Sequence, residues 1–81
     1  MKLVKLGAAW CQPCKMLDQV LETNDFDVQI EYIDIDASLD KAKKYNVRGV
    51  PTVVLEDDEG NELRRFVGAK NASEIREFIT N

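Results

Sequence analysis

The two cysteines of the chain, Cys11 and Cys14, are separated by only two residues. They stand at the start of a segment in which apolar residues recur at the spacing of a helix. Two thiols at this spacing can close into a disulfide and open again. The first backbone N–H groups of a helix have no partners within the helix and carry partial positive charge. This field favours a thiolate at Cys11, and the thiolate is the nucleophilic form. Cys14 follows one helical turn later, so it can attack a mixed disulfide formed at Cys11.

A metal site is the alternative use of the same two thiols. Structural zinc takes four protein ligands, but the chain has two cysteines and no histidine. One chain therefore supplies too few ligands, although a four-thiolate site shared by two chains would hold zinc or an iron–sulfur cluster. The cysteine spacing alone favours dithiol–disulfide chemistry, and we expect no bound metal.

The elements that position the cysteines follow from the periodicity of the apolar residues. Residues 3–6 and 28–35 are typical of strands, and a helix is predicted between them over residues 11–23. A short helix over 38–45 and strands over 52–55 and 63–67 follow. Asn71 and Glu74 have the spacing of a capping box, which predicts the start of a last helix. The apolar helix positions are Met16, Leu17, Val20 and Leu21, then Leu39, Ala42 and Tyr45, and finally Ile75, Phe78 and Ile79.

The predicted order of elements is β-α-β-α-β-β-α, an α/β fold in which three helices flank a four-stranded mixed sheet. A right-handed crossover makes the first two strands parallel. The acidic stretch over residues 57–61 predicts a solvated hairpin turn between the last two strands. A chain of 81 residues without linkers or repeats is expected to form one domain over residues 1–81.

Composition narrows the classes of function. Hydrophobic residues make up 44% of the chain and charged residues 32%, which is typical of a globular protein. The net charge of −4 argues against a general nucleic-acid or anionic-membrane binder. No apolar run approaches the roughly 20 residues of a membrane span. The first residues do not read as a signal peptide, so we expect a cytoplasmic protein, in which a disulfide is usually catalytic.

Three segments together resemble the thioredoxins. Trp10-Cys11-Gln12-Pro13-Cys14 looks like their active site, residues 47–52 (VRGVPT) resemble their cis-proline loop, and residues 67–69 (VGA) resemble their glycine turn. The segments keep the order of the family and span nearly the whole chain. The resemblance implies a minimal thioredoxin fold with strand order 2-1-3-4. The family adds an N-terminal strand and helix before these segments, so in length the chain is similar to glutaredoxins and other small redoxins.

The resemblance also implies a role for each matching residue. Cys11 resembles the attacking cysteine and Cys14 the resolving cysteine. Pro51 resembles the cis-proline beside the cysteines, and the backbone of Val50 would bond a bound peptide. The residues expected to bind the substrate are Trp10, Pro13, Val50, Pro51, Gly68 and Ala69.

Two positions depart from the family pattern. Gln12 stands where thioredoxins have glycine between the cysteines. Lys5 stands where they have a buried aspartate that helps to deprotonate the resolving cysteine, and Tyr32 aligns with the lysine partner of that aspartate. Lys5 can either reach water past the end of the strand or lie near the thiols, where its charge would stabilise a thiolate. In the second case we expect Tyr32 or Asp34 to hold its ammonium.

The leading functional hypothesis is a protein-disulfide reductase that acts as a monomer. Electrons would come from a thioredoxin reductase or from glutathione, so no bound cofactor is needed, and the substrates would be protein disulfides such as that of ribonucleotide reductase. A glutathione-coupled glutaredoxin is an alternative, although Gly68-Ala69 is a poor match to the Gly-Gly pair of that family. An oxidase or isomerase is a further alternative, which the reduction potential would distinguish.

Overall fold

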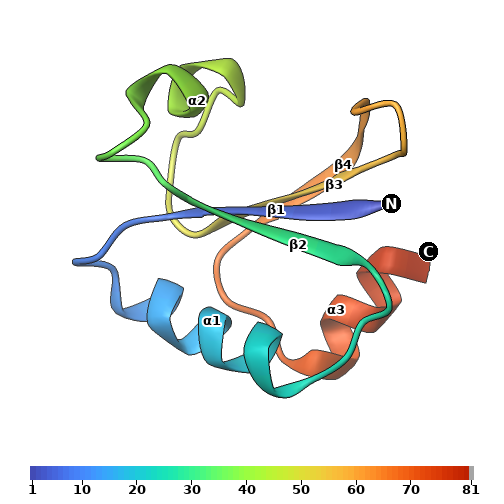
Figure 1. Ribbon diagram of the computed structural model, residues 1–81. Helices are drawn as coiled ribbons and strands as arrows, with labels where there is room; N and C mark the ends of the chain where they lie inside the picture. The colour runs from blue at the N-terminus through green and yellow to red at the C-terminus, as the bar shows by residue number, and fades with distance from the viewer. Residues whose placement is uncertain (81) are drawn as a thin grey trace.

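A computed structural model describes residues 1–80 of the chain, and it contains one four-stranded sheet with three helices (Figure 1). The predicted α/β fold and element order are confirmed. The elements in chain order are β1 (Lys2–Gly7), α1 (Gln12–Thr23), β2 (Gln29–Asp34), α2 (Leu39–Lys44), β3 (Thr52–Glu56), β4 (Glu62–Val67) and α3 (Ala72–Thr80).

The strand order is β2-β1-β3-β4, as predicted. β1 pairs in parallel with β2 and antiparallel with β3, while β3 and β4 form an antiparallel hairpin. β1 and β3 are therefore the two central strands, and both are buried along most of their length. The carboxyl end of β1 leads directly into the cysteine motif. A central strand, paired on both sides, therefore positions the start of α1.

The helices divide between the two faces of the sheet (Figure 1). α1 and α3 cover one face and α2 covers the other. Because strand side chains alternate between faces, Leu3 of β1 joins the core under α1 and α3, whereas Val4 joins the core under α2. The larger core lies under α1 and α3, and its buried members are Leu3, Leu17, Leu21, Phe26, Val53, Leu55, Ile75 and Ile79.

Two of the apolar helix positions that recur at helical spacing are exposed. In α1, Leu17 and Leu21 are buried but Met16 is 58% exposed. In α2, Leu39 is 66% exposed, and none of the six residues of the helix is buried. Leu39 is exposed because α2, with six residues, is too short to lay a full apolar stripe on the sheet. Met16 lies at the edge of the stripe of α1, beyond the reach of the core.

The last helix begins as predicted. The side chain of Asn71 accepts a hydrogen bond from the backbone N–H of Glu74 at 2.8 Å, and the carboxylate of Glu74 accepts one from the N–H of Asn71 at 3.0 Å. This reciprocal pair is a capping box. Arg64 of β4 donates to the carbonyls of Phe78 and Ile79 at the other end of α3. Within residues 1–80, no helix has the length and apolar character to cross a membrane.

Candidate active site

Cys11 and Cys14 form a disulfide at the start of α1. Their Cα atoms are 5.2 Å apart, within the usual range for a disulfide. Cys11 is 4% exposed and Cys14 is 1% exposed, and they form a buried cluster with Ala8 against which Ile35 and Val50 pack. Both cysteines are thus buried, and Cys11 is the slightly more exposed of the two.

Cys11 is the N-cap residue of α1. Its backbone is extended, and its Sγ accepts a hydrogen bond from the N–H of Cys14 at 3.2 Å. Pro13 follows in the first turn, where the missing N–H of proline costs no helical hydrogen bond. No acidic residue lies in that turn. The positive end of the helix and one direct N–H donor therefore act on Cys11 sulfur, and both favour its thiolate.

The predicted proline loop lies beside the cysteines. The Val50–Pro51 peptide bond is cis, the geometry that the resemblance implied. Val50 packs against the cysteine cluster, and the side chain of Pro51 is buried. The carbonyl of Pro51 accepts a hydrogen bond from the N–H of Gly68 at 2.8 Å, which ties the glycine turn to this loop.

Gly68 needs its glycine for conformational reasons. Its φ of +98° lies in a region that side chains with a Cβ rarely adopt. A Cβ built there would meet no atom within 4 Å, so the space beside the turn is open. Ala69 is exposed next to it. The turn thus leaves room for another backbone to approach.

The remaining predicted surface residues flank the disulfide. Trp10 is 69% exposed, and its indole Nε1–H donates to Asp36 at 2.9 Å. Pro13 is exposed on the first turn of α1. Val67, at the end of β4 and 62% exposed, was not singled out from the sequence. Val67 pairs with Thr52, the residue that follows the cis-proline, and this pairing could not be predicted without the strand register.

Lys5 is buried and does not reach water past the strand end. Its side chain is 7% exposed, and Nζ lies 2.7 Å from Oδ1 of Asp18 on α1. The expectation that Tyr32 or Asp34 holds the ammonium was wrong, because its ion-pair partner is Asp18 of the helix packed on the same face. Asp18 was missed, although it follows Cys14 by four residues and therefore shares its side of the helix.

Tyr32 and Asp34 have other surroundings. Tyr32 lies beside Lys5 in the strand register but is 46% exposed. Partial burial, together with the charges of Glu22 and Asp18, raises the pKa of its phenol. The carboxylate of Asp34 accepts a hydrogen bond from the N–H of Asp36 at 2.9 Å, which shapes the turn after β2. Both residues line an open cavity of about 560 Å³ together with Lys5 and Asp18.

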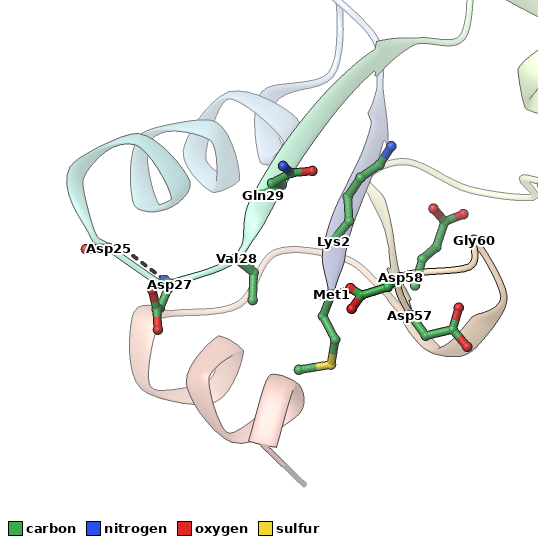
Figure 2. A pocket seen from close by; sticks show the side chains of 10 residues that line it. Met1, Lys2, Asp25, Asp27, Val28, Gln29, Asp57, Asp58 and Gly60 are labelled. Atoms are coloured by element: carbon green, nitrogen blue, oxygen red, sulfur yellow. Dashed lines mark hydrogen bonds and ion pairs between the residues drawn. The ribbon is translucent and has the colours of Figure 1, made fainter.

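A hollow of about 670 Å³ lies at the opposite end of the sheet, and neither cysteine lines it (Figure 2). Lys2 and Gln29, at the beginnings of their strands, line it together with Asp25, Asp27 and Asp58. Its acidic residues are not gathered around a common point. Within residues 1–80, no three histidine, cysteine or acidic side chains form a group that could hold a metal ion.

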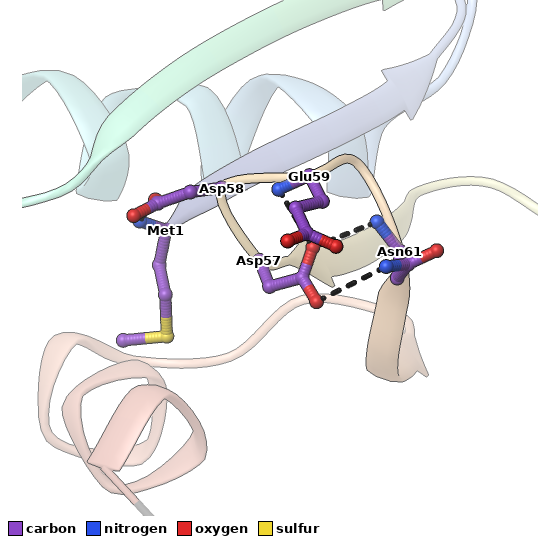
Figure 3. A network of polar contacts seen from close by, with 5 residues as sticks. All are labelled: Met1, Asp57, Asp58, Glu59 and Asn61. Atoms are coloured by element: carbon purple, nitrogen blue, oxygen red, sulfur yellow. Dashed lines mark hydrogen bonds and ion pairs between the residues drawn. The ribbon is translucent and has the colours of Figure 1, made fainter.

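The carboxylates beside this hollow organise the β3–β4 turn (Figure 3). Asp57 accepts hydrogen bonds from the N–H groups of Asn61 and Glu59, each at 2.9 Å. These bonds, led by those from Asn61, lower the pKa of the Asp57 carboxyl. Asp58 pairs with the amino group of Met1 at 2.7 Å. The acidic turn is therefore a structural hairpin tip.

Comparison with known proteins gives one consistent family. The Thioredoxin family model matches residues 1–81. A thioredoxin-like protein of an SPbeta prophage in Bacillus subtilis is 39% identical over 98% of this chain and 95% of its own length. The thioredoxin of Chlamydia pneumoniae is 42% identical over 98% of this chain and 76% of its own length. The structure of a mutant thioredoxin from Halobacterium salinarum superposes with a TM-score of 0.88 at 38% identity, covering 96% of this chain and 70% of that one.

The chain belongs to the thioredoxin family. Its disulfide occupies the start of α1, and its sheet and helices superpose on solved thioredoxins. It is therefore a thiol–disulfide oxidoreductase whose activity is the reduction of protein disulfides through the Cys-x-x-Cys pair. The glutaredoxin alternative gains no comparable support, since the similar proteins described above are thioredoxins or thioredoxin-like.

Proposed function

We propose that Cys11 attacks the substrate and Cys14 resolves the intermediate. The Cys11 thiolate attacks one sulfur of a partner disulfide, and the other partner sulfur leaves with the electron pair and takes up a proton. The Cys14 thiol then loses its proton, and its thiolate attacks the Cys11 sulfur. The Cys11–Cys14 bond forms, the mixed disulfide breaks, and the partner leaves as a dithiol. Two electrons pass from this chain to the partner.

The N-cap geometry of Cys11 carries this assignment. A thiolate at the N-cap lies on the positive end of the helix and accepts the N–H of Cys14. The sulfur of Cys14 lies inside the first turn and is the less exposed of the pair. An incoming disulfide therefore meets Cys11 first, at the site where negative charge is better stabilised.

The partner surface is assigned to the residues around the disulfide. The cis-proline loop and the glycine turn would hold an extended segment of the partner by its backbone, because Gly68 leaves the approach open. Trp10 adds a large exposed aromatic surface, a residue type enriched where proteins bind one another. The assigned contact residues are Trp10, Pro13, Val50, Pro51, Gly68 and Ala69.

The source of electrons is assigned to a flavin-containing thioredoxin reductase, with glutathione as the rival donor. Such a cycle stores its electrons in the Cys11–Cys14 pair and needs no bound cofactor. Candidate substrates are protein disulfides formed during turnover, such as that of ribonucleotide reductase. We assign the activity to a monomeric domain of residues 1–81 and to the cytoplasm, where disulfides are commonly transient and catalytic.

Two cysteine variants test the roles. Cys14→Ser is expected to accumulate a mixed disulfide with a reducible protein such as insulin, because the first step proceeds and the second cannot. Cys11→Ser is the matched control and should accumulate none. Alkylation of the reduced protein at pH 7 should label Cys11 faster than Cys14. Faster labelling of Cys14, or trapping by the Cys11→Ser variant, would reverse the assignment.

The electron donor is tested by comparing two reducing systems. NADPH with a thioredoxin reductase should restore the dithiol much faster than reduced glutathione with glutathione reductase. The opposite ranking would support the glutaredoxin-like cycle. Visible absorbance and a metal assay on the freshly purified protein separate both cycles from a metal or iron–sulfur site shared by two chains.

A further inference from the structure

A buried ion pair lies between the central strand and the helix that carries the cysteines. Lys5 of β1 is 7% exposed, Asp18 of α1 is 32% exposed, and Nζ lies 2.7 Å from Oδ1. The two groups are close but poorly aligned, so Oδ1 has no hydrogen-bond partner within residues 1–80. Burying a lysine charge is costly unless it is paired and hydrogen-bonded, and an apolar side chain at such a position is often equally stable.

The ammonium of Lys5 lies next to the sulfur of Cys14, and Gly7 provides the space. A Cβ built at Gly7 would lie 2.6 Å from Nζ of Lys5 and 3.0 Å from Sγ of Cys14. The sum of these two distances is an upper limit on the Nζ–Sγ separation. That limit falls within the roughly 4–6 Å over which a charge shifts the ionisation of its neighbour.

Asp18 approaches the same place from the helix. It follows Cys14 by four residues, so the two side chains lie one turn apart on the same side of α1. A positive and a negative group therefore both lie near Cys14, and both line the adjacent cavity. Lys15, Tyr32 and Asp34 are the other titratable groups that line this cavity.

We propose that the Lys5–Asp18 pair controls the ionisation of Cys14 by opposing charges, with Lys5 favouring the thiolate and Asp18 opposing it while holding Lys5 in place. The inference rests on the proposed resolving role of Cys14. In that step the thiol proton of Cys14 passes to water in the cavity, and the thiolate that Lys5 stabilises attacks Cys11. The sulfur–sulfur bond forms and the partner thiolate leaves, as described above. Lys5 and Asp18 are positioning residues and exchange no electrons.

The test is a pH titration of the reduced protein labelled with ¹³C at the cysteine Cβ atoms, with each cysteine assigned separately. Lys5→Met keeps most of the stem but leaves the charge of Asp18 unopposed, so the Cys14 pKa should rise by about one pH unit. Asp18→Asn leaves the ammonium unopposed, so the Cys14 pKa should fall. Opposite shifts are the expected signature, because a purely structural role would not give them.

A matched control removes a charge from the same cavity without breaking the pair. Lys15→Met does this, because Lys15 is exposed on α1 and forms no ion pair with a described residue. Its effect on Cys14 should be much smaller than that of Lys5→Met, since water screens an exposed charge. The double variant Lys5→Met/Asp18→Asn contains no unpaired buried charge and should have a Cys14 pKa between those of the single variants. It keeps the test decisive if a single variant fails to fold.

Shifts in the same direction for Lys5→Met and Asp18→Asn would overturn the inference. So would unchanged titration, or an equal effect of Lys15→Met. The reduction potential gives a second readout and should fall for Lys5→Met, because the reduced form loses stabilisation. The titration does not depend on which cysteine attacks the substrate. If alkylation reverses the cysteine roles while the opposite shifts remain, the proposed function fails and the electrostatic inference stands.

Discussion

Polar contacts tie helices to the sheet on both faces, and two of them differ in kind. On the α1 face, Lys5 and Asp18 form an ion pair beside Cys14. On the α2 face, Tyr45 donates a hydrogen bond to Glu56 of β3 at 2.7 Å. The second contact satisfies a buried carboxylate with a neutral donor, far from the sulfurs. The first keeps two charges in a buried place, where they can act on a reacting atom.

The helices on the two faces also differ in how many of their residues are buried. α1 buries Cys14, Leu17 and Leu21, whereas no residue of α2 is buried. The disulfide thus lies on a helix whose buried residues Leu17 and Leu21 belong to the larger core, and this core holds Cys11 and Cys14 in place. α2 is linked to the sheet by the Tyr45 hydrogen bond and by the ion pair of Lys41 with Glu31 of β2. Function and stability are concentrated on one face, and this separation can be tested.

The largest expected effect is the loss of a core anchor on the α1 face. Leu17→Ala removes a fully buried side chain and should cost about 3 kcal/mol of unfolding free energy. Leu39→Ala on α2 is the matched control, since Leu39 is 66% exposed, and it should cost less than about 0.5 kcal/mol. Urea unfolding of both variants gives the comparison. Similar losses would show that the two helices are packed equally.

The next effect concerns the space that Gly7 provides. Gly7→Ala should cost about 1–3 kcal/mol, because the new methyl would overlap Lys5 and press on the Cys14 sulfur. Gly49→Ala is the control. Its Cβ would meet the nearest side-chain atom, Cγ1 of Val67, at an ordinary 3.5 Å. If urea unfolding gives equal losses, the Lys5 ammonium can move aside at little cost and its position is not fixed.

The hydrogen bond on the α2 face predicts an effect at high pH. Burial, with help from Glu56, raises the pKa of Tyr45 from 10.0 to about 12. A raised pKa means that this contribution to stability is complete below pH 10 and is lost as the pH rises toward 12. Unfolding measured across that range should show the loss.

Tyr45→Phe should abolish this pH dependence. It should also cost about 1–2 kcal/mol at neutral pH, because the Glu56 carboxylate loses its donor. Tyr32→Phe is the matched control, because the Tyr32 phenol donates no hydrogen bond to a described residue and its loss should cost less. A Tyr45→Phe variant with undiminished high-pH sensitivity would assign the effect to other groups.

Much of this molecule was predictable from local sequence signals. The cysteine spacing, the capping box of Asn71 and Glu74, and the alternation in the strands each depend on neighbours in the chain, and all three were confirmed. The partner of Lys5 was not predicted. Strand register places Tyr32 beside Lys5 on the same face, but the ammonium pairs with a carboxylate of the helix that packs over that face. Only the packing of α1 identifies Asp18.

The exposure of Leu39 was also not predictable from local sequence signals. A pattern of apolar residues predicts a face but not whether the helix reaches the sheet, and a helix of six residues makes too little contact to be buried. The resemblance supplied what local signals could not, namely that the proline loop and the glycine turn lie beside the cysteines.

The smallest expected effect compares how the two faces begin their helices. Asn71 caps α3 through a reciprocal pair with Glu74, whereas the side chain of Ser38 makes no capping hydrogen bond to α2. Asn71→Ala should therefore cost about 1 kcal/mol, while Ser38→Ala should cost less than about 0.5 kcal/mol. Glu74→Gln keeps an acceptor for the Asn71 N–H and should lose less than Asn71→Ala. Equal losses for Asn71→Ala and Ser38→Ala would mean that α2 is capped in solution as firmly as α3. The difference in stability between the α1 face and the α2 face would then depend only on how many apolar residues each face buries.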